Sequence, residues 1–325
     1  MALLEVKDVG VAIGALQPLD GISLHVDRGE ILGVVGESGS GKSLTALSVL
    51  GLLPLIGGCI ERGSVRFDDQ DLVGLPESSL RKLRGKRIAL ISQNPMTSLD
   101  PIVRIGAQID QVSVLHLGLS AKAARERSLD MLNQLRIPDA ETVHRNYPHQ
   151  LSGGMKQRIV IAMALAADPD LIVADEPTTA LDVTIQAQII QTLIDLVTER
   201  QLALMLITHD MGVVAQACDR VIVMYAGRVA ESDTVASIFA TPRHPYTRAL
   251  IACIPTSDQR PGTLKGIAGT VPGVQAYPSG CRYHPRCAAA GPRCAGEVPL
   301  LQGAGSAYLA CHYPLSPAGG ALSDD

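Results

Sequence analysis

Short apolar runs separated by turn segments dominate the first third of the chain, and helical periodicity takes over further along. Strands are expected at residues 3–9, 22–26, 30–35, 87–92, 171–174 and 203–207. Helices are expected at residues 44–53, 121–135 and 183–199, with Ser120 as the N-cap of the second. Buried strands that alternate with helices predict an α/β fold with a parallel or mixed sheet.

The composition of the sequence changes after Pro255, where Gly, Pro and Cys become frequent and helical periodicity weakens. At about 150 residues per domain, 325 residues predict two units. We therefore expect a first domain over residues 1–255 and a small Cys-rich module over residues 256–325, ending in a loose tail from Ser316.

Composition and charge exclude some classes of protein. The chain has 28 Lys and Arg against 32 Asp and Glu, a net charge of −4, which argues against a partner of nucleic acid. The longest apolar run, Ile159–Ala167, is well short of the ~18 residues that span a bilayer. Acidic residues near the N-terminus, Glu5 and Asp8, argue against a secretory signal. A cytoplasmic location is expected, where structural disulfides are rare.

One glycine-rich segment fits the pattern G-x-x-x-x-G-K-[ST] at every fixed position, between an expected strand and an expected helix. Its candidate phosphate-binding residues are Gly36, Ser38, Gly39, Ser40, Gly41, Lys42, Ser43 and Leu44. Glycines let the backbone N–H groups point at phosphate, the helix N-terminus adds positive potential, and the Ser43 hydroxyl can ligate Mg²⁺. A chance match by a glycine-rich turn is the weaker alternative, because strand, loop and helix occur in order.

A second acidic motif follows the apolar run 171–174. Asp175 ends this strand and is placed to hold Mg²⁺, and Glu176 is a candidate base for an attacking water. An ordinary solvated acidic turn is the alternative, and the intact phosphate-binding loop weakens it.

The segment Leu151–Arg158, with the sequence LSGGMKQR, resembles the signature motif of ABC-transporter ATPases. Three further marks of that family occur in order: Gln93 resembles the Q-loop glutamine, Ala180-Leu181-Asp182 the D-loop, and His209 the switch histidine. The resemblance implies a P-loop NTPase core with a helical subdomain at about residues 96–165.

The family's known mechanism implies a role for each of these positions. Two such domains dimerise head to tail around two ATP molecules, and the signature loop (Ser152, Gly153, Gly154) of one closes on the γ-phosphate held by the other. By this resemblance Glu176, His209 and Gln93 are catalytic, Asp182 links the two sites, and Ser43, Gln93 and Asp175 hold Mg²⁺. The family commonly stacks adenine on an aromatic residue, but residues 10–18 contain none, so Ile13 or Leu16 is the candidate.

Three further segments resemble the branch that energises di- and oligopeptide import: Ser92–Pro101, Pro242–Leu250 and the Cys-containing end of the chain. This branch implies two transmembrane permeases, a second and paralogous ATPase, an extracytoplasmic solute-binding protein, and a place on the cytoplasmic face of the inner membrane. Nickel complexes, opines and other small solutes are alternative cargoes. A soluble ABC protein that acts on ribosomes or DNA is the rival of a different class.

Four cysteines in the last 45 residues follow the spacing C-x5-C-x6-C-x16-C: Cys281, Cys287, Cys294 and Cys311. Four thiols can hold zinc or an iron–sulfur cluster. The resemblance implies a structural [4Fe-4S] cluster, while zinc and unligated thiols stay open. The other cysteines, Cys59, Cys218 and Cys253, are expected to be small core residues.

Overall fold

The computed structural model describes residues 2–178, 182–255 and 266–316, apart from the side chains of residues 183 and 184. The chain divides into two compact units. Unit 1 contains residues 27–30 and 74–207, and unit 2 contains residues 2–26, 31–73 and the chain from residue 208 onward. Unit 2 is thus built from both ends of the sequence.

Unit 1 is a parallel β-sheet with helices. Its strands are β6 (Ile88–Ile91), β7 (Leu171–Asp175) and β8 (Ala203–Thr208), and β7 pairs in parallel with both of the others. These strands are almost wholly buried, as their continuous apolar sequences predict. The parallel pairing brings the carboxyl ends of the strands to one edge of the sheet, where the motif residues follow.

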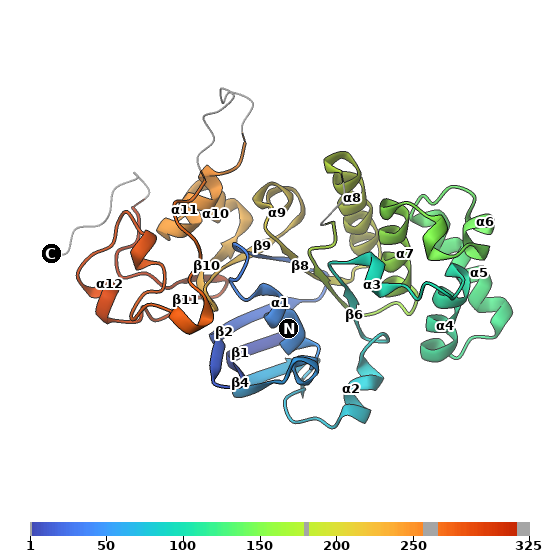
Figure 1. Ribbon diagram of the computed structural model, residues 1–325, viewed down its shortest axis with the longest axis horizontal. Coiled ribbons are helices and arrows are strands. Elements are labelled where there is room, and N and C mark those ends of the chain that lie inside the picture. Colours follow the sequence, from blue (N-terminus) through green and yellow to red (C-terminus); the bar gives the residue numbers. More distant parts are fainter. Residues whose placement is uncertain (1, 179–181, 256–265, 317–325) are drawn as a thin grey trace. The chain divides into compact units, whose positions relative to one another are not determined.

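The helices of unit 1 lie mostly between β6 and β8 in the sequence (Figure 1). They are α2 (Glu77–Leu83), α3 (Pro95–Ser98), α4 (Ile105–Leu117), α5 (Ala121–Gln134), α6 (Ala140–Arg145), the 3₁₀ helix η2 (Pro148–Gln150), α7 (Gly153–Leu165) and α8 (Val183–Glu199). Helix α7 packs against β6, α3, α4, α5 and α8, so it is the centre of this helical group.

Unit 2 contains two groups of strands. The first has the order β2-β1-β4-β5, from β1 (Ala2–Ile13), β2 (Leu16–Asp27), β4 (Gly58–Phe67) and β5 (Gln70–Asp71), as Figure 1 shows for its labelled strands. The second has the order β11-β12-β10-β9-β3, from β3 (Ile31–Val35), β9 (Arg220–Tyr225), β10 (Arg228–Thr234), β11 (Gln302–Ala304) and β12 (Ala307–Leu309). Strand β3 runs parallel to β9, and β9 runs antiparallel to β10, so this sheet is mixed.

The helices of unit 2 are short. They are α1 (Lys42–Val49), α9 (Met211–Ala217), α10 (Val235–Ala240), α11 (Pro245–Ala252), α12 (Arg293–Gly296) and the 3₁₀ helices η1 (Leu53–Ile56), η3 (Val274–Ala276) and η4 (His284–Arg286). Although aromatic residues are scarce, Tyr225, Tyr246 and Tyr283 gather in one buried cluster, with ring centroids 4.7 to 5.1 Å apart. The C-terminal residues therefore share a core with β9 and α11.

Most expected elements are present, with shifted ends. Ser120 caps α5, since its hydroxyl accepts a hydrogen bond from Ala123 N at 3.3 Å. The helix expected at residues 44–53 ends at Val49, and Leu53–Ile56 form a 3₁₀ turn around Pro54. The first two strands extend well beyond the ends expected for them. In the described ranges, none of the helices has the length and apolarity needed to cross a membrane.

Burial of His244 makes the stability of unit 2 depend on pH. Its Nδ1 accepts a hydrogen bond from Tyr246 N at 3.0 Å as the N-cap of α11, and desolvation lowers the pKa of His244 to about 4. In the unfolded chain the pKa returns to about 6.5. The unfolded state therefore binds a proton first, and stability present above pH 6.5 is lost as the pH falls toward 4.

We expect the free energy of unfolding to fall by about 3 kcal/mol from this group between pH 6.5 and 4. Urea unfolding followed by circular dichroism at several pH values measures it. The variant His244→Asn keeps an N-cap acceptor and does not titrate, so its stability should vary less with pH. Equal pH dependence in the two proteins would contradict the assignment.

Candidate functional site

The backbone after β3 forms a tight cradle whose glycines are required by geometry. Gly36 has φ +154°, and a Cβ there would lie 2.3 Å from Met224 O. Gly41 has φ +101°, and its Cβ would lie 2.5 Å from Leu19 Cδ2. Both positions therefore exclude a side chain, as a loop that wraps closely around phosphate requires.

Polar groups of this loop are arranged for an anion. Lys42 Nζ donates to Gly36 O at 2.7 Å and Glu37 O at 3.1 Å, so the buried lysine lies across the loop. Ser40 Oγ is buried and finds no hydrogen-bond partner among the residues that the structure describes. Ser38, Gly39 and Ser43 are exposed. An unsatisfied buried hydroxyl in the cradle fits a loop that takes up phosphate oxygens.

The acidic motif of unit 1 lies at the carboxyl ends of β6 and β7. Asp175 ends β7, and Glu176 follows in the left-handed region with φ +45°. Glu176 N donates to Ile207 O at 2.9 Å, which holds this strained residue in place. Gln93 Nε2 donates to Glu176 Oε2 at 3.1 Å. The structure thus brings together two predicted catalytic residues that are 83 positions apart.

The signature segment opens α7. Ser152 is the N-cap, and its Oγ accepts a hydrogen bond from Met155 N at 3.3 Å. Ser152 and Gly153 are exposed, whereas Gly154 is buried against α8, where a Cβ would lie 2.9 Å from Ile185 Cγ2. The N-cap and the first residue of a 13-residue helix are therefore open to solvent, where helix N–H groups are suited to an anion.

The two remaining motif residues each adjoin a helix start. His209 is exposed after β8, and Asp210 caps α9 by accepting hydrogen bonds from Gly212 N at 2.7 Å and Val213 N at 3.2 Å. Asp182 is exposed as the N-cap residue of α8. The other D-loop residues, Ala180 and Leu181, lie outside the described residues.

The four C-terminal cysteines lie near one another. Cys281 N donates to Cys294 O at 2.8 Å, and burial together with the neighbouring thiols raises the pKa of Cys281, of Cys287 and, to about 12, of Cys311. Within the described parts of the chain, however, no group of three or more His, Cys, Asp or Glu residues is arranged to hold a metal ion. The geometry therefore gives the predicted [4Fe-4S] cluster no direct support.

The other cysteines differ in exposure. Cys218 and Cys253 are half-buried, while Cys59 is exposed on β4, so the expectation of a core position is wrong for Cys59.

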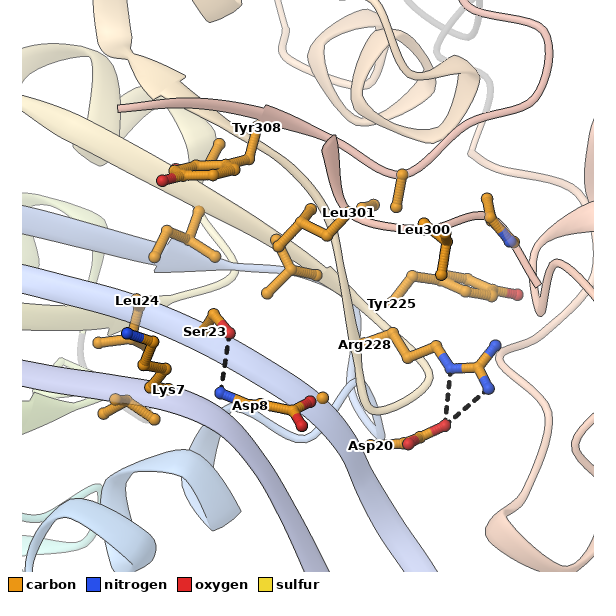
Figure 2. Close-up of a pocket in the computed structure, with 18 of the residues that line it drawn as sticks. Lys7, Asp8, Asp20, Ser23, Leu24, Tyr225, Arg228, Leu300, Leu301 and Tyr308 are labelled. Atoms are coloured by element: carbon orange, nitrogen blue, oxygen red, sulfur yellow. Dashed lines mark hydrogen bonds and ion pairs between the residues drawn. The ribbon is translucent and has the colours of Figure 1, made fainter. Parts of the chain in front are cut away.

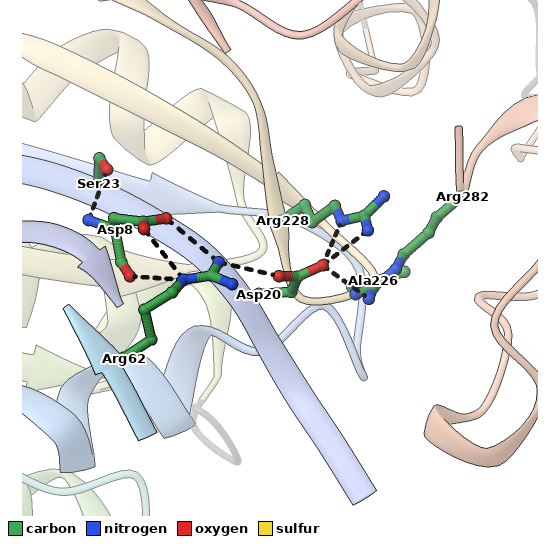
Figure 3. Close-up of polar contacts among 7 residues, drawn as sticks. All are labelled: Asp8, Asp20, Ser23, Arg62, Ala226, Arg228 and Arg282. Carbon is green, nitrogen blue, oxygen red and sulfur yellow. Dashed lines mark hydrogen bonds and ion pairs between the residues drawn. The ribbon is translucent and has the colours of Figure 1, made fainter. Parts of the chain in front are cut away.

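An arginine of the cysteine segment docks onto β2 (Figure 3). Asp20 accepts hydrogen bonds from Arg228 at 2.6 Å and Arg62 at 3.1 Å, and Arg282 lies 3.4 Å away. Burial alone would raise the pKa of Asp20, but the hydrogen bonds and charges of Arg228, Arg62 and Arg282 outweigh it and lower the pKa. The carboxylate thus stays ionised and ties the C-terminal residues to the N-terminal strands.

A cavity of about 750 Å³ lies beside this network. Figure 2 shows Leu300, Leu301 and Tyr308 on one side of it, facing Lys7 and Ser23 of β1 and β2. Cys281 also lines it, but no residue of the phosphate-binding loop does. The cavity is therefore not the site that the nucleotide motifs form.

These ion pairs were not predicted. Arg62, Arg228 and Arg282 carry no local pattern, because their partner lies far away in the sequence. The sequence gives one hint of these ion pairs: Arg282 directly follows Cys281, and Arg286 directly precedes Cys287. By contrast, the phosphate-binding loop and the Ser-capped start of α7 were predicted. A P-loop that occurs with this Ser-Gly-Gly helix start defines an ATPase of the ATP-binding cassette class.

Comparisons with known proteins agree with that class. The sequence profile of the ABC transporter family matches residues 19–179, and that of the oligopeptide/dipeptide transporter C-terminal region matches residues 230–294. The dimeric ATP-binding cassette MJ0796, solved in a post-hydrolysis state bound to ADP and Pi, superposes with a TM-score of 0.64. It is 28% identical, and the match covers 71% of this chain and 98% of that one.

Two curated relatives are more similar. The dipeptide transport ATP-binding protein DppD of Escherichia coli is 46% identical over 324 residues, which is 98% of this chain and 99% of the relative. The oligopeptide transport ATP-binding protein OppD of Bacillus subtilis is 49% identical over 258 residues, 78% of this chain and 72% of the relative. The chain belongs to the family of ATP-binding proteins of oligopeptide and dipeptide ABC transporters, whose activity is ATP hydrolysis.

Close packing of α7 against α8 yields a prediction at the signature motif. Alanine normally stabilises a helix by up to ~1 kcal/mol relative to glycine. Here we expect Gly154→Ala to destabilise the protein by about 1–3 kcal/mol, because its methyl group overlaps Ile185 Cγ2. Thermal and urea unfolding measure the change.

Two substitutions of Ile185 test whether this overlap is the cause of the destabilisation. Ile185→Leu removes the β-branch and should relieve the loss in a double variant, whereas Ile185→Val keeps Cγ2 and should not. Equal stability of the two double variants would contradict the overlap.

Proposed function

We propose that this protein is the ATP-hydrolysing subunit that drives import of di- and oligopeptides by an ABC transporter. One observation carries the proposal: similarity to a dipeptide transport ATP-binding protein extends over 98% of the chain. It includes a C-terminal region of the oligopeptide/dipeptide type, which a general ABC ATPase would not need.

ATP and Mg²⁺ are the ligands that the motif residues fit. The loop Gly36–Ser43 would bind the phosphates, with Lys42 leaving its carbonyl partners for the β- and γ-phosphates. Ser43, Gln93 and Asp175 would hold Mg²⁺, which neutralises phosphate charge when bound. The buried, unpartnered Ser40 Oγ supports phosphate binding at this loop.

Hydrolysis needs a base and a group that senses the nucleotide. Glu176 is the proposed base, and its hydrogen bond from Gln93 supports a shared role for the two. His209 contacts the γ-phosphate in this proposal, Asp182 links two sites of a dimer, and Ser152, Gly153 and Gly154 of one subunit close on the ATP held by another. The exposed start of α7 supports this last role.

The wider assembly follows from the family. The proposed partners are two transmembrane permeases, a second and paralogous ATPase, and an extracytoplasmic solute-binding protein, with the chain on the cytoplasmic face of the membrane. Nickel complexes or opines are alternative cargoes. The match to the peptide-transporter C-terminal region weighs against a soluble ABC protein that acts on ribosomes or DNA.

The proposed ATPase domain is residues 1–255, with residues 96–165 as its helical subdomain and residues 256–325 as a Cys-rich extension. The boundary adjoins residues 256–265, which lie outside the described residues. In this proposal Cys281, Cys287, Cys294 and Cys311 hold a structural [4Fe-4S] cluster. The spacing C-x5-C-x6-C-x16-C in the sequence, and not the geometry of the thiols, carries this part of the proposal.

Replacement of the proposed base tests the mechanism. We expect Glu176→Gln to keep ATP binding and to lose at least 100-fold in ATP turnover, because the amide cannot accept the proton of water. The measurement uses the complex reconstituted in proteoliposomes with its permeases and binding protein, and it follows phosphate release and uptake of a labelled dipeptide. Uptake should stop together with turnover.

The exposed Glu199→Gln at the end of α8 is the control, and it should hydrolyse and transport normally. Normal turnover by Glu176→Gln would remove Glu176 as the base. Turnover in the wild-type complex without uptake of any peptide would remove the proposed cargo.

The cluster is tested on the full chain purified without oxygen. We expect bound iron and sulfide and a broad absorption in the visible blue, all lost in a variant with Cys287→Ser and Cys294→Ser. Zinc in place of iron, or no metal at all, would contradict the cluster.

A further inference from the structure

The phosphate-binding loop carries a carboxylate that a distant arginine holds. Glu37 follows Gly36 directly, and its two carboxylate oxygens accept hydrogen bonds from Arg286 at 2.7 and 3.0 Å. The Arg286 side chain is only 7% exposed and that of Glu37 28%. Two parallel charge-assisted hydrogen bonds shielded from water fix both orientation and distance.

Arg286 is itself held in one orientation. Its Nε donates to Ala268 O at 2.8 Å, its Nη2 to Gly269 O at 3.2 Å, and its Nη1 to Tyr225 Oη at 3.3 Å. The hydrogen bonds to Glu37 raise the pKa of Arg286 further, so the guanidinium is always charged. Its donors are thus preorganised before any nucleotide arrives.

A second contact from the C-terminal half reaches the same loop residue. Glu37 N donates to Tyr246 Oη at 2.9 Å, and Tyr246 is wholly buried in the tyrosine cluster. Glu37 is therefore held through its backbone by Tyr246 of α11 and through its side chain by Arg286 of η4. These contacts lie within unit 2, so they belong to one compact body.

Electrostatics gives this arrangement a function. A carboxylate in a loop that binds a triphosphate repels the ligand, because like charges a few ångström apart in a partly dry site interact strongly. The ion pair with Arg286 cancels that repulsion and adds cationic N–H groups beside the loop. Removal of Arg286 would leave the negative charge of Glu37 uncompensated next to the phosphates.

We propose that Arg286 is a positioning residue of the phosphate-binding loop, which neutralises and orients Glu37 so that affinity for ATP depends on the Cys281–Cys287 segment. The proposal rests on ATP binding at this loop, but not on the transported solute or on a metal at the cysteines.

The test is the affinity of the full chain for a fluorescent ATP analogue with Mg²⁺. We expect Arg286→Ala to weaken binding about tenfold. Arg286→Lys keeps the charge but not the two parallel N–H donors of the guanidinium, so we expect it to weaken binding less. Addition of Glu37→Gln to Arg286→Ala should restore most of the affinity, because the repulsive charge is gone. If Arg286 had only a structural role, adding Glu37→Gln to Arg286→Ala would not restore the affinity.

If Arg286→Ala fails to fold, the single variant Glu37→Gln tests the proposal in its place. It leaves Arg286 as an uncompensated cation near the phosphates, so we expect about threefold tighter binding. The control is Arg293→Ala, which removes an exposed ion pair with Glu297 in the same C-terminal region and should leave the affinity unchanged.

Unchanged affinity in Arg286→Ala, absence of rescue in the double variant, or weaker binding by Glu37→Gln would each overturn the proposal. Failure of the proposed function is distinguishable. Wild-type protein that binds no nucleotide would end both proposals, whereas a complex that imports another solute would leave the role of Arg286 intact.

Discussion

The pairing of β3 with β9 is the constraint on which the rest of unit 2 depends. The two strands run parallel, and Ile31 and Asp219 exchange hydrogen bonds of 2.8 and 2.9 Å at its beginning. Because β3 ends at Val35 and β9 ends at Tyr225, the loop that follows β3 lies on the turn that follows β9. Gly227 N donates to Ser40 O at 2.8 Å. The shape of the phosphate-binding loop is therefore made by residues from both ends of the chain.

Ion pairs between acidic residues of the N-terminal half and arginines of the C-terminal half add to this contact between the two parts of unit 2. Arg282 reaches Asp20 and Arg286 reaches Glu37, so one short segment between two cysteines supplies both docking cations. In partly buried ion pairs the Coulomb attraction offsets the cost of desolvation only where the geometry is good. Such pairs therefore contribute more to the choice of one arrangement than to stability. The paired arginines thus select a single position for the C-terminal residues on the cassette.

Local pattern predicted the parts of the site that local physics determines. The buried runs of β3 and β7, the glycines of the phosphate-binding loop and the capping Ser152 each follow from neighbouring residues in the sequence. Strand β9 was missed, although its six residues are all buried. The pairing of Glu37 with Arg286 could not be predicted, because two side chains 249 positions apart leave no periodic signal.

The discontinuous make-up of unit 2 has a consequence for biosynthesis. A ribosome makes β3 and α1 early, but β9, the strand that pairs with β3 in the same unit, begins only at Arg220. At roughly 5–20 residues per second, β3 waits on the order of ten seconds or more for β9. Unit 1, whose residues 74–207 are continuous, is complete by then. The phosphate-binding loop acquires its final surroundings only after Arg286 has been added, so a nascent chain lacks the finished loop until 249 further residues have followed Glu37.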